Sequence, residues 1–154
     1  MIFSERYKDV AASVLALTEN EDDPISLMAT MAAELFGAFD YFDWVGFYRN
    51  VGENTLKIGP YQGGHGCLVI PFSRGVCGAC ARRQETIIVP DVDAFTDHIA
   101  CSSSTRSEIV LPVFDAQANL LAVLDIDSDQ LGAFDQTDQK DLETLLQQVF
   151  ARAT

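Results

Sequence analysis

The chain has 154 residues, 48% of them hydrophobic, and its 10 basic and 23 acidic residues give a net charge of −13. This length suits one domain with one core, which we assign to residues 1–154. The charge argues against nucleic acid and anionic membranes as partners, and no apolar run is long enough to cross a bilayer. The first residues lack the basic and apolar segments of a signal peptide, so we expect a cytoplasmic protein with reduced cysteines.

Helices are predicted at both ends of the chain. Apolar residues recur at helical spacing over 7–15 and again over 25–36, where Asp23 and Pro24 mark the start of the second helix. A last helix begins near Asp135, whose side chain can cap it.

Strands are predicted in the middle of the chain. Aromatic and β-branched residues indicate strands over 43–48, 55–58, 68–70, 86–89, 109–114 and 120–127. A short helix is expected over 75–85. The polar segment 91–107 lacks periodicity, and a loop of that length in a compact domain is usually functional or disordered. This order predicts an α+β domain with a central antiparallel sheet, the N- and C-terminal helices on one face and loops on the other.

Three of the four cysteines stand among Gly, His and Ser, which are residues typical of loops: Cys67, Cys77 and Cys101. Such thiols are available for redox chemistry, in which one thiolate becomes a sulfenic acid and a second thiol condenses with it to give a disulfide. Cys101 is the best candidate for the nucleophile, because it follows His98 by three residues and precedes Glu108 by seven. Cys67 or Cys77 would then be the second thiol. Inert burial of all three is the alternative.

Metal binding is the other alternative for these cysteines. Cys77 and Cys80 form a C-x-x-C pair, but the predicted topology around it does not match that of a thioredoxin motif. A zinc site made of all four cysteines has poor spacing, because only this one pair is close. We therefore expect no metal and no cofactor.

Asp125 and Asp127 lie two apart on a predicted strand, so both point to the same face. Glu108 lies at the same end of the hairpin. A symmetric register pairs residue 108 with residue 126, which puts Glu108 on the opposite face, whereas a shift of one residue places it beside an aspartate. If the three carboxyls cluster, at least one has a raised pKa and can act as a general acid, and the others can hold an ammonium group. A solvated strand end is the alternative.

Trp44 and Tyr48 lie four apart on the first strand and share a face. Core packing is the default for both aromatic rings. A pocket wall that holds a small apolar group, such as a methyl group, is the alternative. His98 is either a structural loop residue or a group that tunes Cys101.

At these residues the chain resembles the free methionine-(R)-sulfoxide reductases, a family of single GAF domains. The matching segments are 43–48, 59–63, Cys67, 70–72, 75–78, 89–92, 98–101, 107–108 and 124–128. The resemblance covers about residues 43–134. It implies a GAF fold and the reduction of free, rather than protein-bound, methionine (R)-sulfoxide.

The resemblance also implies roles for the cysteines. Cys101 is the nucleophile, Cys67 is the first resolving thiol, and Cys77 is an alternative or relay thiol. Thioredoxin would reduce the resulting disulfide. A homodimer formed through the terminal helices is plausible by analogy with GAF domains.

Substrate contacts follow from the same resemblance. Glu108, Asp125 and Asp127 are implied to bind the substrate and to donate a proton, and Trp44 is implied to contact the S-methyl group. We expect Tyr48, which shares a strand face with Trp44, to bind the substrate too.

The chain departs from the family pattern at three positions. Cys80 replaces a small residue, Thr96 replaces a proline, and Ser102 replaces an aspartate. These changes affect the expected rigidity of the loop and the rate more than the type of reaction. The alternative function is a GAF sensor that reports redox state or binds a small ligand without turnover.

Overall fold

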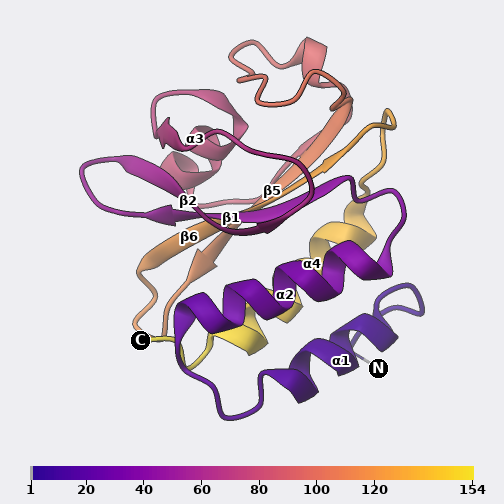
Figure 1. The fold of residues 1–154 in the computed structure, drawn as a ribbon, viewed down its shortest axis with the longest axis vertical. Helices are drawn as coiled ribbons and strands as arrows, with labels where there is room; N and C mark the ends of the chain where they lie inside the picture. Colours follow the sequence, from indigo (N-terminus) through magenta and orange to yellow (C-terminus); the bar gives the residue numbers. More distant parts are fainter. Residues whose placement is uncertain (1) are drawn as a thin grey trace.

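The computed structural model describes residues 2–154, which form four α-helices, one 3₁₀ turn and six strands (Figure 1). The helical segments are α1 (Lys8–Leu17), α2 (Pro24–Ala38), α3 (Gly75–Arg83), η1 (Val92–Ala94) and α4 (Gln136–Phe150). The strands are β1 (Trp44–Asn50), β2 (Thr55–Gln62), β3 (Val69–Pro71), β4 (Ile87–Val89), β5 (Ser107–Phe114) and β6 (Leu120–Ser128).

The strands of residues 2–154 form one sheet in the order β3-β2-β1-β6-β5-β4, and each pair of neighbours is antiparallel. The terminal helices α1, α2 and α4 lie together on one side of this sheet, and α3 lies on the other side (Figure 1). The predicted α+β architecture is therefore confirmed. Helix α3 adds a cover to the loop side of the sheet.

The helix side of the sheet holds the larger of two hydrophobic cores. Val45 and Phe47 of β1 and Leu124 and Ile126 of β6 point into this core and are fully buried. Burial of an aliphatic or aromatic side chain of this size contributes about 1.5–3 kcal/mol. Since alternate residues of a strand point to opposite faces, residues 44, 46, 48, 125 and 127 face the loop side.

Capping side chains begin two of the packing helices. Asp23 accepts a hydrogen bond from the backbone N–H of Ser26 at the start of α2. The Asp135 side chain accepts hydrogen bonds from the backbone of α4, and the Asp138 side chain accepts one from the backbone N–H of Asp135, which completes a capping box. The helix starts predicted near Asp23 and Asp135 are thus where the structure has them.

A β-bulge decides the register of the β5–β6 hairpin. At the turn Phe114 pairs with Leu120, as the symmetric register requires, but Val113 then pairs with Ala122 and leaves Leu121 as an extra residue. From that point onward every pair is shifted by one residue. Glu108 therefore pairs with Asp127 rather than with residue 126.

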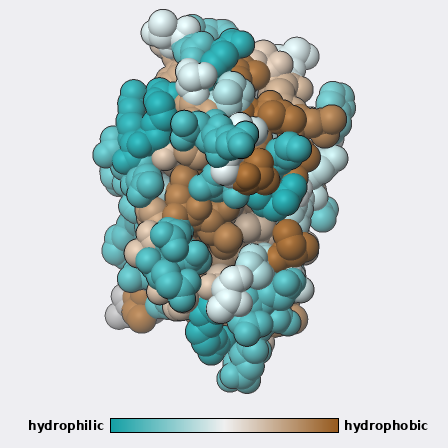
Figure 2. All heavy atoms as spheres, turned by 90° about the vertical axis from the view of Figure 1, so that its left-hand side faces the viewer, coloured by the Kyte–Doolittle hydropathy of each residue, from teal (hydrophilic) through white to brown (hydrophobic). Residues whose placement is uncertain are grey.

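The surface is mixed in character. Figure 2 shows the side of the molecule that faces left in Figure 1, where hydrophilic residues predominate and apolar residues reach the surface in patches. None of the helices in residues 2–154 is long and apolar enough to cross a membrane.

Candidate active site

A small cavity lies on the loop side of the sheet, between β1, β6, α3 and the loop that precedes β5. Its volume is about 40 Å³. Seven of the eight residues predicted for the site line it: Trp44, Tyr48, Cys77, Cys101, Glu108, Asp125 and Asp127. The eighth, Cys67, is joined to the cavity through its bond to Cys101. Segments far apart in the sequence thus meet at one place.

The three carboxyl groups cluster at the floor of the cavity. Glu108 lies directly across from Asp127, and Asp125 follows on the same face of β6. Glu108 and Asp125 are buried, whereas Asp127 is partly exposed. One oxygen of each carboxyl has no hydrogen-bond partner among the described residues. These oxygens are free to accept a hydrogen bond from a ligand that carries an ammonium or a protonated group.

Burial and mutual repulsion change the acidity of this cluster. Burial, followed by the charge of Asp125, raises the pKa of Glu108 well above its ordinary value. Burial also raises the pKa of Asp125 and of Asp127, with further contributions from the charges of Asp127 and Glu108 respectively. The cluster therefore holds at least one proton at a pH where isolated carboxyls are ionised, and it can serve as a general acid.

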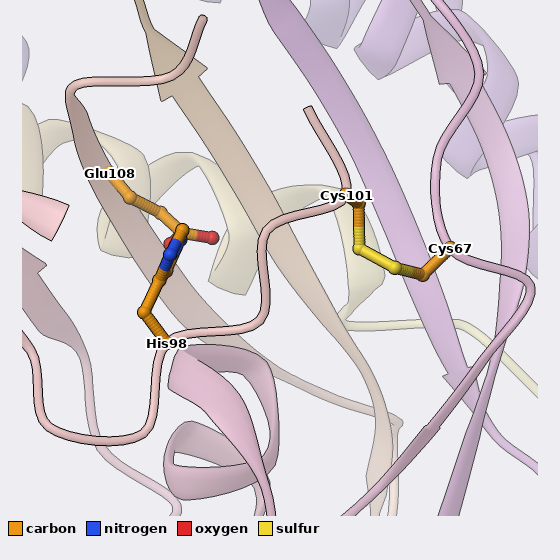
Figure 3. The surroundings of a disulfide bond; sticks show 4 residues. All are labelled: Cys67, His98, Cys101 and Glu108. Carbon is orange, nitrogen blue, oxygen red and sulfur yellow. A yellow bond between two sulfur atoms is a disulfide. The ribbon is translucent and has the colours of Figure 1, made fainter. Parts of the chain in front are cut away.

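A disulfide bond joins Cys67 to Cys101, and Cys101 lines the cavity (Figure 3). The two Cα atoms are 5.4 Å apart, within the range of ordinary disulfides. Cys67 lies in the loop between β2 and β3, and Cys101 lies in the long loop before β5. The predicted loop placement of these two thiols is confirmed, and the disulfide ties the loop before β5 to the loop between β2 and β3.

His98 lies beside the carboxyl cluster. Its Nε2 atom is 3.7 Å from Oε1 of Glu108, and both side chains are largely buried (Figure 3). Burial lowers the pKa of His98 below its ordinary value, with an opposing contribution from Asp93. A neutral imidazole at this position can exchange a proton with Glu108.

The short helix expected over 75–85 is α3, so Cys77 lies on a helix and not in the loop that its glycine neighbours suggested. Cys77 lies in α3 and is buried, and its Sγ atom lies close to Glu108 and Asp125. Burial, followed by the charge of Asp125, raises its pKa, so the group is a thiol rather than a thiolate. Cys80, one turn further along α3, is also buried, and burial raises its pKa too. The Gly-rich run that suggested a loop instead lets α3 approach the sheet, because a Cβ on Gly78 would lie 2.7 Å from the carbonyl oxygen of Pro71.

The aromatic rings of Trp44 and Tyr48 line one wall of the site. Trp44 stacks on Tyr48 and on Tyr61, with ring centroids 5.8 and 5.3 Å apart. The indole N–H of Trp44 donates a hydrogen bond of 2.7 Å to the carbonyl oxygen of Gly64. The Trp44 ring lies over Gly46, where any Cβ would collide with it. Gly46 lies two residues after Trp44 and two residues before Tyr48, on the same face of β1. A glycine between two aromatic residues on one strand face indicates that a ring covers it, and the sequence analysis missed this.

One group in the described residues could hold a cation. Ligand atoms of Cys77, Glu108 and Asp125 all lie within 4.8 Å of one another. This set of one thiol and two carboxyls belongs to the same cavity. The four-cysteine zinc site is not assembled, because Cys67 and Cys101 are bonded to each other.

Known proteins are similar to this chain in fold and in sequence. The GAF domain family matches residues 23–153. The free methionine-R-sulfoxide reductase of Escherichia coli is 36% identical over 146 residues, which cover 95% of this chain and 87% of that protein. The chain belongs to the free methionine-R-sulfoxide reductases.

Solved structures of this reductase family agree with that assignment. The enzyme from Neisseria meningitidis in complex with its substrate superposes with a TM-score of 0.88 at 42% identity, covering 95% of this chain and 87% of that one. The Staphylococcus aureus enzyme in complex with substrate gives a TM-score of 0.90 at 34% identity, covering 100% and 99%. The family suggested by residues 43–134 is confirmed, and the GAF match extends it toward both ends of the chain.

Several residues that line this reductase site were not proposed from the sequence. His65, Ile99 and Thr105 contribute to the cavity wall. Two of them could have been proposed because they lie near a candidate cysteine in the chain: His65 precedes Cys67 by two residues, and Ile99 precedes Cys101 by two. The individual roles assigned to the site residues stay predictions.

Proposed function

We propose that this protein reduces free methionine (R)-sulfoxide to methionine, with Cys101 as the nucleophile and Cys67 as the first resolving thiol. Its family members are oxidoreductases that act on a sulfur group. One observation carries the proposal: Cys101, which is bonded to Cys67, lines the same cavity as the carboxyl groups of Glu108, Asp125 and Asp127.

The first step is oxygen transfer. A sulfoxide oxygen is a poor leaving group until it is protonated, so the acid form of Glu108, Asp125 or Asp127 donates a proton to it. The Cys101 thiolate attacks the sulfoxide sulfur, and the oxygen passes to Cys101. The products are methionine and the sulfenic acid of Cys101.

The second step is disulfide formation. The Cys67 thiol attacks the sulfenic acid, the S–O bond breaks, and water leaves as the Cys67–Cys101 bond forms. Cys67 precedes Cys77 in this role, because Cys67 is bonded to Cys101, whereas Cys77 is a buried thiol with a raised pKa. Cys77 is an alternative thiol that lies behind the first pair.

The shape and charge of the site support a free amino acid as substrate. Unpartnered carboxyl oxygens can accept hydrogen bonds from the substrate ammonium, and Trp44 and Tyr48 provide an apolar wall for the methyl group. The loop that carries Cys101 closes over the cavity. A peptide-bound methionine sulfoxide carries chain on both sides, and a loop that closes over the bound substrate leaves no space for that chain.

The cellular setting is part of the proposal. A cytoplasmic location, a single domain over residues 1–154, thioredoxin as reductant and a homodimer through the terminal helices are all predictions. Sedimentation of the purified protein tests the dimer.

A single-turnover assay tests the function. Reduced protein, freed of reductant, is mixed with separated epimers of methionine sulfoxide, and released methionine is counted. With the R epimer, we expect wild type to release one methionine per chain and Cys101→Ser to release none. Cys67→Ser should also release one methionine per chain and should retain a sulfenic acid on Cys101 that can be trapped. If wild type releases no methionine in the presence of dithiothreitol, the protein is a sensor rather than this enzyme.

A further inference from the structure

The two sulfur atoms of the disulfide lie in different surroundings. Cys101 lines the cavity, whereas Cys67 does not. In Figure 3 the S–S bond runs from the Cys101 loop toward Cys67, and His98 and Glu108 lie on the Cys101 side of it. The disulfide therefore joins one cysteine that lines the cavity to one that does not.

This difference determines which sulfur a reductant can attack. Thiol–disulfide exchange proceeds by attack of a thiolate on one sulfur as the other leaves, and the attacking atom approaches along the S–S axis from behind the attacked sulfur. Approach to Cys101 comes from the cavity, whose volume of about 40 Å³ has no room for a protein thiol. Approach to Cys67 comes from outside the cavity. A reductant that is a protein is thus restricted to Cys67.

The chain next to Cys67 has the surface of a docking site. Leu68 is 71% exposed, the largest value among the exposed large hydrophobic residues of the described chain, and Val69 is 53% exposed. The segment from Gly66 to Phe72 carries no charged residue. Two adjacent exposed apolar side chains directly after a redox cysteine suggest a surface that a partner covers.

The backbone of β3, next to Cys67, also has one edge that is free to pair with another strand. Val69 begins β3, which is the end strand of the sheet and pairs only with β2. Edge strands leave unpaired N–H and C=O groups and are usually protected by charges or cover. An extended segment of a partner can pair with such an edge and present its own thiol to the neighbouring residue.

We propose that a dithiol protein of the thioredoxin class docks on the segment Cys67–Val69 and attacks Sγ of Cys67. This inference rests on the proposed function. The partner thiolate forms a mixed disulfide with Cys67, and Cys101 leaves as the thiolate that the next turnover needs. The second thiol of the partner then attacks the mixed disulfide, releases Cys67 as a thiolate that takes up a proton, and leaves the partner oxidised. Two electrons pass from the dithiol to the disulfide.

Kinetics with two reductants test the docking surface. The double variant Leu68→Glu/Val69→Glu should lower kcat/KM for thioredoxin by about tenfold or more, because charge opposes apolar burial, while turnover with dithiothreitol stays within about twofold of wild type. The matched control is Leu17→Glu, which changes a residue of similar exposure (62%) on α1, on the other side of the sheet. The control should leave both reactions unchanged.

Other outcomes would overturn the proposal. Unchanged thioredoxin kinetics in the double variant would mean that the partner docks elsewhere. If the sedimentation coefficient also changes, the β3 edge is instead a contact with a second copy of this chain. An equal loss with both reductants would place the segment in catalysis or stability. Wild type that is inactive with dithiothreitol contradicts the proposed function instead.

Trapping identifies the attacked sulfur. Thioredoxin that lacks its resolving cysteine is mixed with the oxidised wild-type protein, and the mixed disulfide is mapped by mass spectrometry of peptides. The adduct is expected on Cys67. An adduct on Cys101 would contradict the restriction imposed by the cavity.

Discussion

At the scale of single residues, function here depends on environment more than on residue type. Asp125 and Asp127 on an exposed strand end would be ordinary ionised carboxyls. In the cavity beside Glu108, the pKa values of these carboxyls are raised and the cluster holds a proton, because burial and neighbouring charge both disfavour the ionised form. The acid chemistry required by a sulfoxide is therefore a property of the cluster.

The carboxyl cluster should lower stability at high pH. A pKa of Glu108 that is raised in the folded state favours folding at low pH, and this contribution is lost as the pH rises through the raised value. Glu108→Gln should thus be more stable than wild type by about 1–3 kcal/mol at about pH 8, and should differ little at about pH 4. Its kcat/KM should fall by about 10²- to 10⁴-fold. Denaturant unfolding at both pH values checks this, and equal effects at both would contradict it.

Gly46 should be required for the aromatic wall. A Cβ at this position would collide with the Trp44 ring and lie 2.6 Å from Cβ of Tyr61. Gly46→Ala should cost about 1–3 kcal/mol through overpacking and should raise KM, because Trp44 must move. Gly37→Ala is the matched control, since nothing lies within 4 Å of its Cβ, and it should stabilise α2 by about 0.5–1 kcal/mol. Thermal unfolding and steady-state kinetics of both variants measure the difference.

At the scale of elements, the β5–β6 hairpin shows what pattern can and cannot predict. Both strands and their turn were predicted, because hydrophobic alternation and turn residues are local signals. The symmetric register holds only at the turn, and the bulge at Leu121 then shifts it by one residue. That shift brings Glu108 beside Asp127. A bulge depends on how each strand packs against its two neighbours, so local sequence does not specify it.

Helix α4 illustrates an element whose start is encoded locally. Asp135→Ala should destabilise the protein by about 1 kcal/mol, because two backbone N–H groups lose their acceptor. Asp135→Asn should retain most of that stability, since asparagine caps a helix about as well as aspartate. The stability that this variant still loses measures the exposed ion pair between Asp135 and Arg6, whose atoms are 3.1 Å apart. Thermal unfolding ranks the three proteins. If the asparagine variant is as unstable as the alanine variant, the ion pair dominates the cap.

At the scale of the whole molecule, the two faces of the sheet have separate tasks. The helix side provides the main core, and the loop side holds the cavity. A cavity of about 40 Å³ has room for about one or two water molecules. An amino acid does not fit. We therefore expect reduction of the disulfide to free the Cys101 loop before substrate enters.

Substrate binding should depend on the redox state. Trp44 is the one tryptophan in the sequence and lines the cavity, so its fluorescence reports binding. Methionine (R)-sulfoxide should change the fluorescence of the Cys101→Ser variant, which cannot form the disulfide. It should leave oxidised wild-type protein unchanged. Equal responses from the two proteins would show that the disulfide does not gate entry.

The sequence by itself determined the helix and strand content, the helix caps and the candidate residues, because spacing, capping and turn preferences act over a few neighbours. The motif pattern of residues 43–134 also indicated the family. Only the tertiary structure decided that Cys77 is buried beside Glu108 and Asp125, that a bulge aligns Glu108 with Asp127, and that Cys101 lines the cavity whereas Cys67 does not. These depend on packing between segments far apart in the chain, and such packing leaves no periodic signal in the sequence.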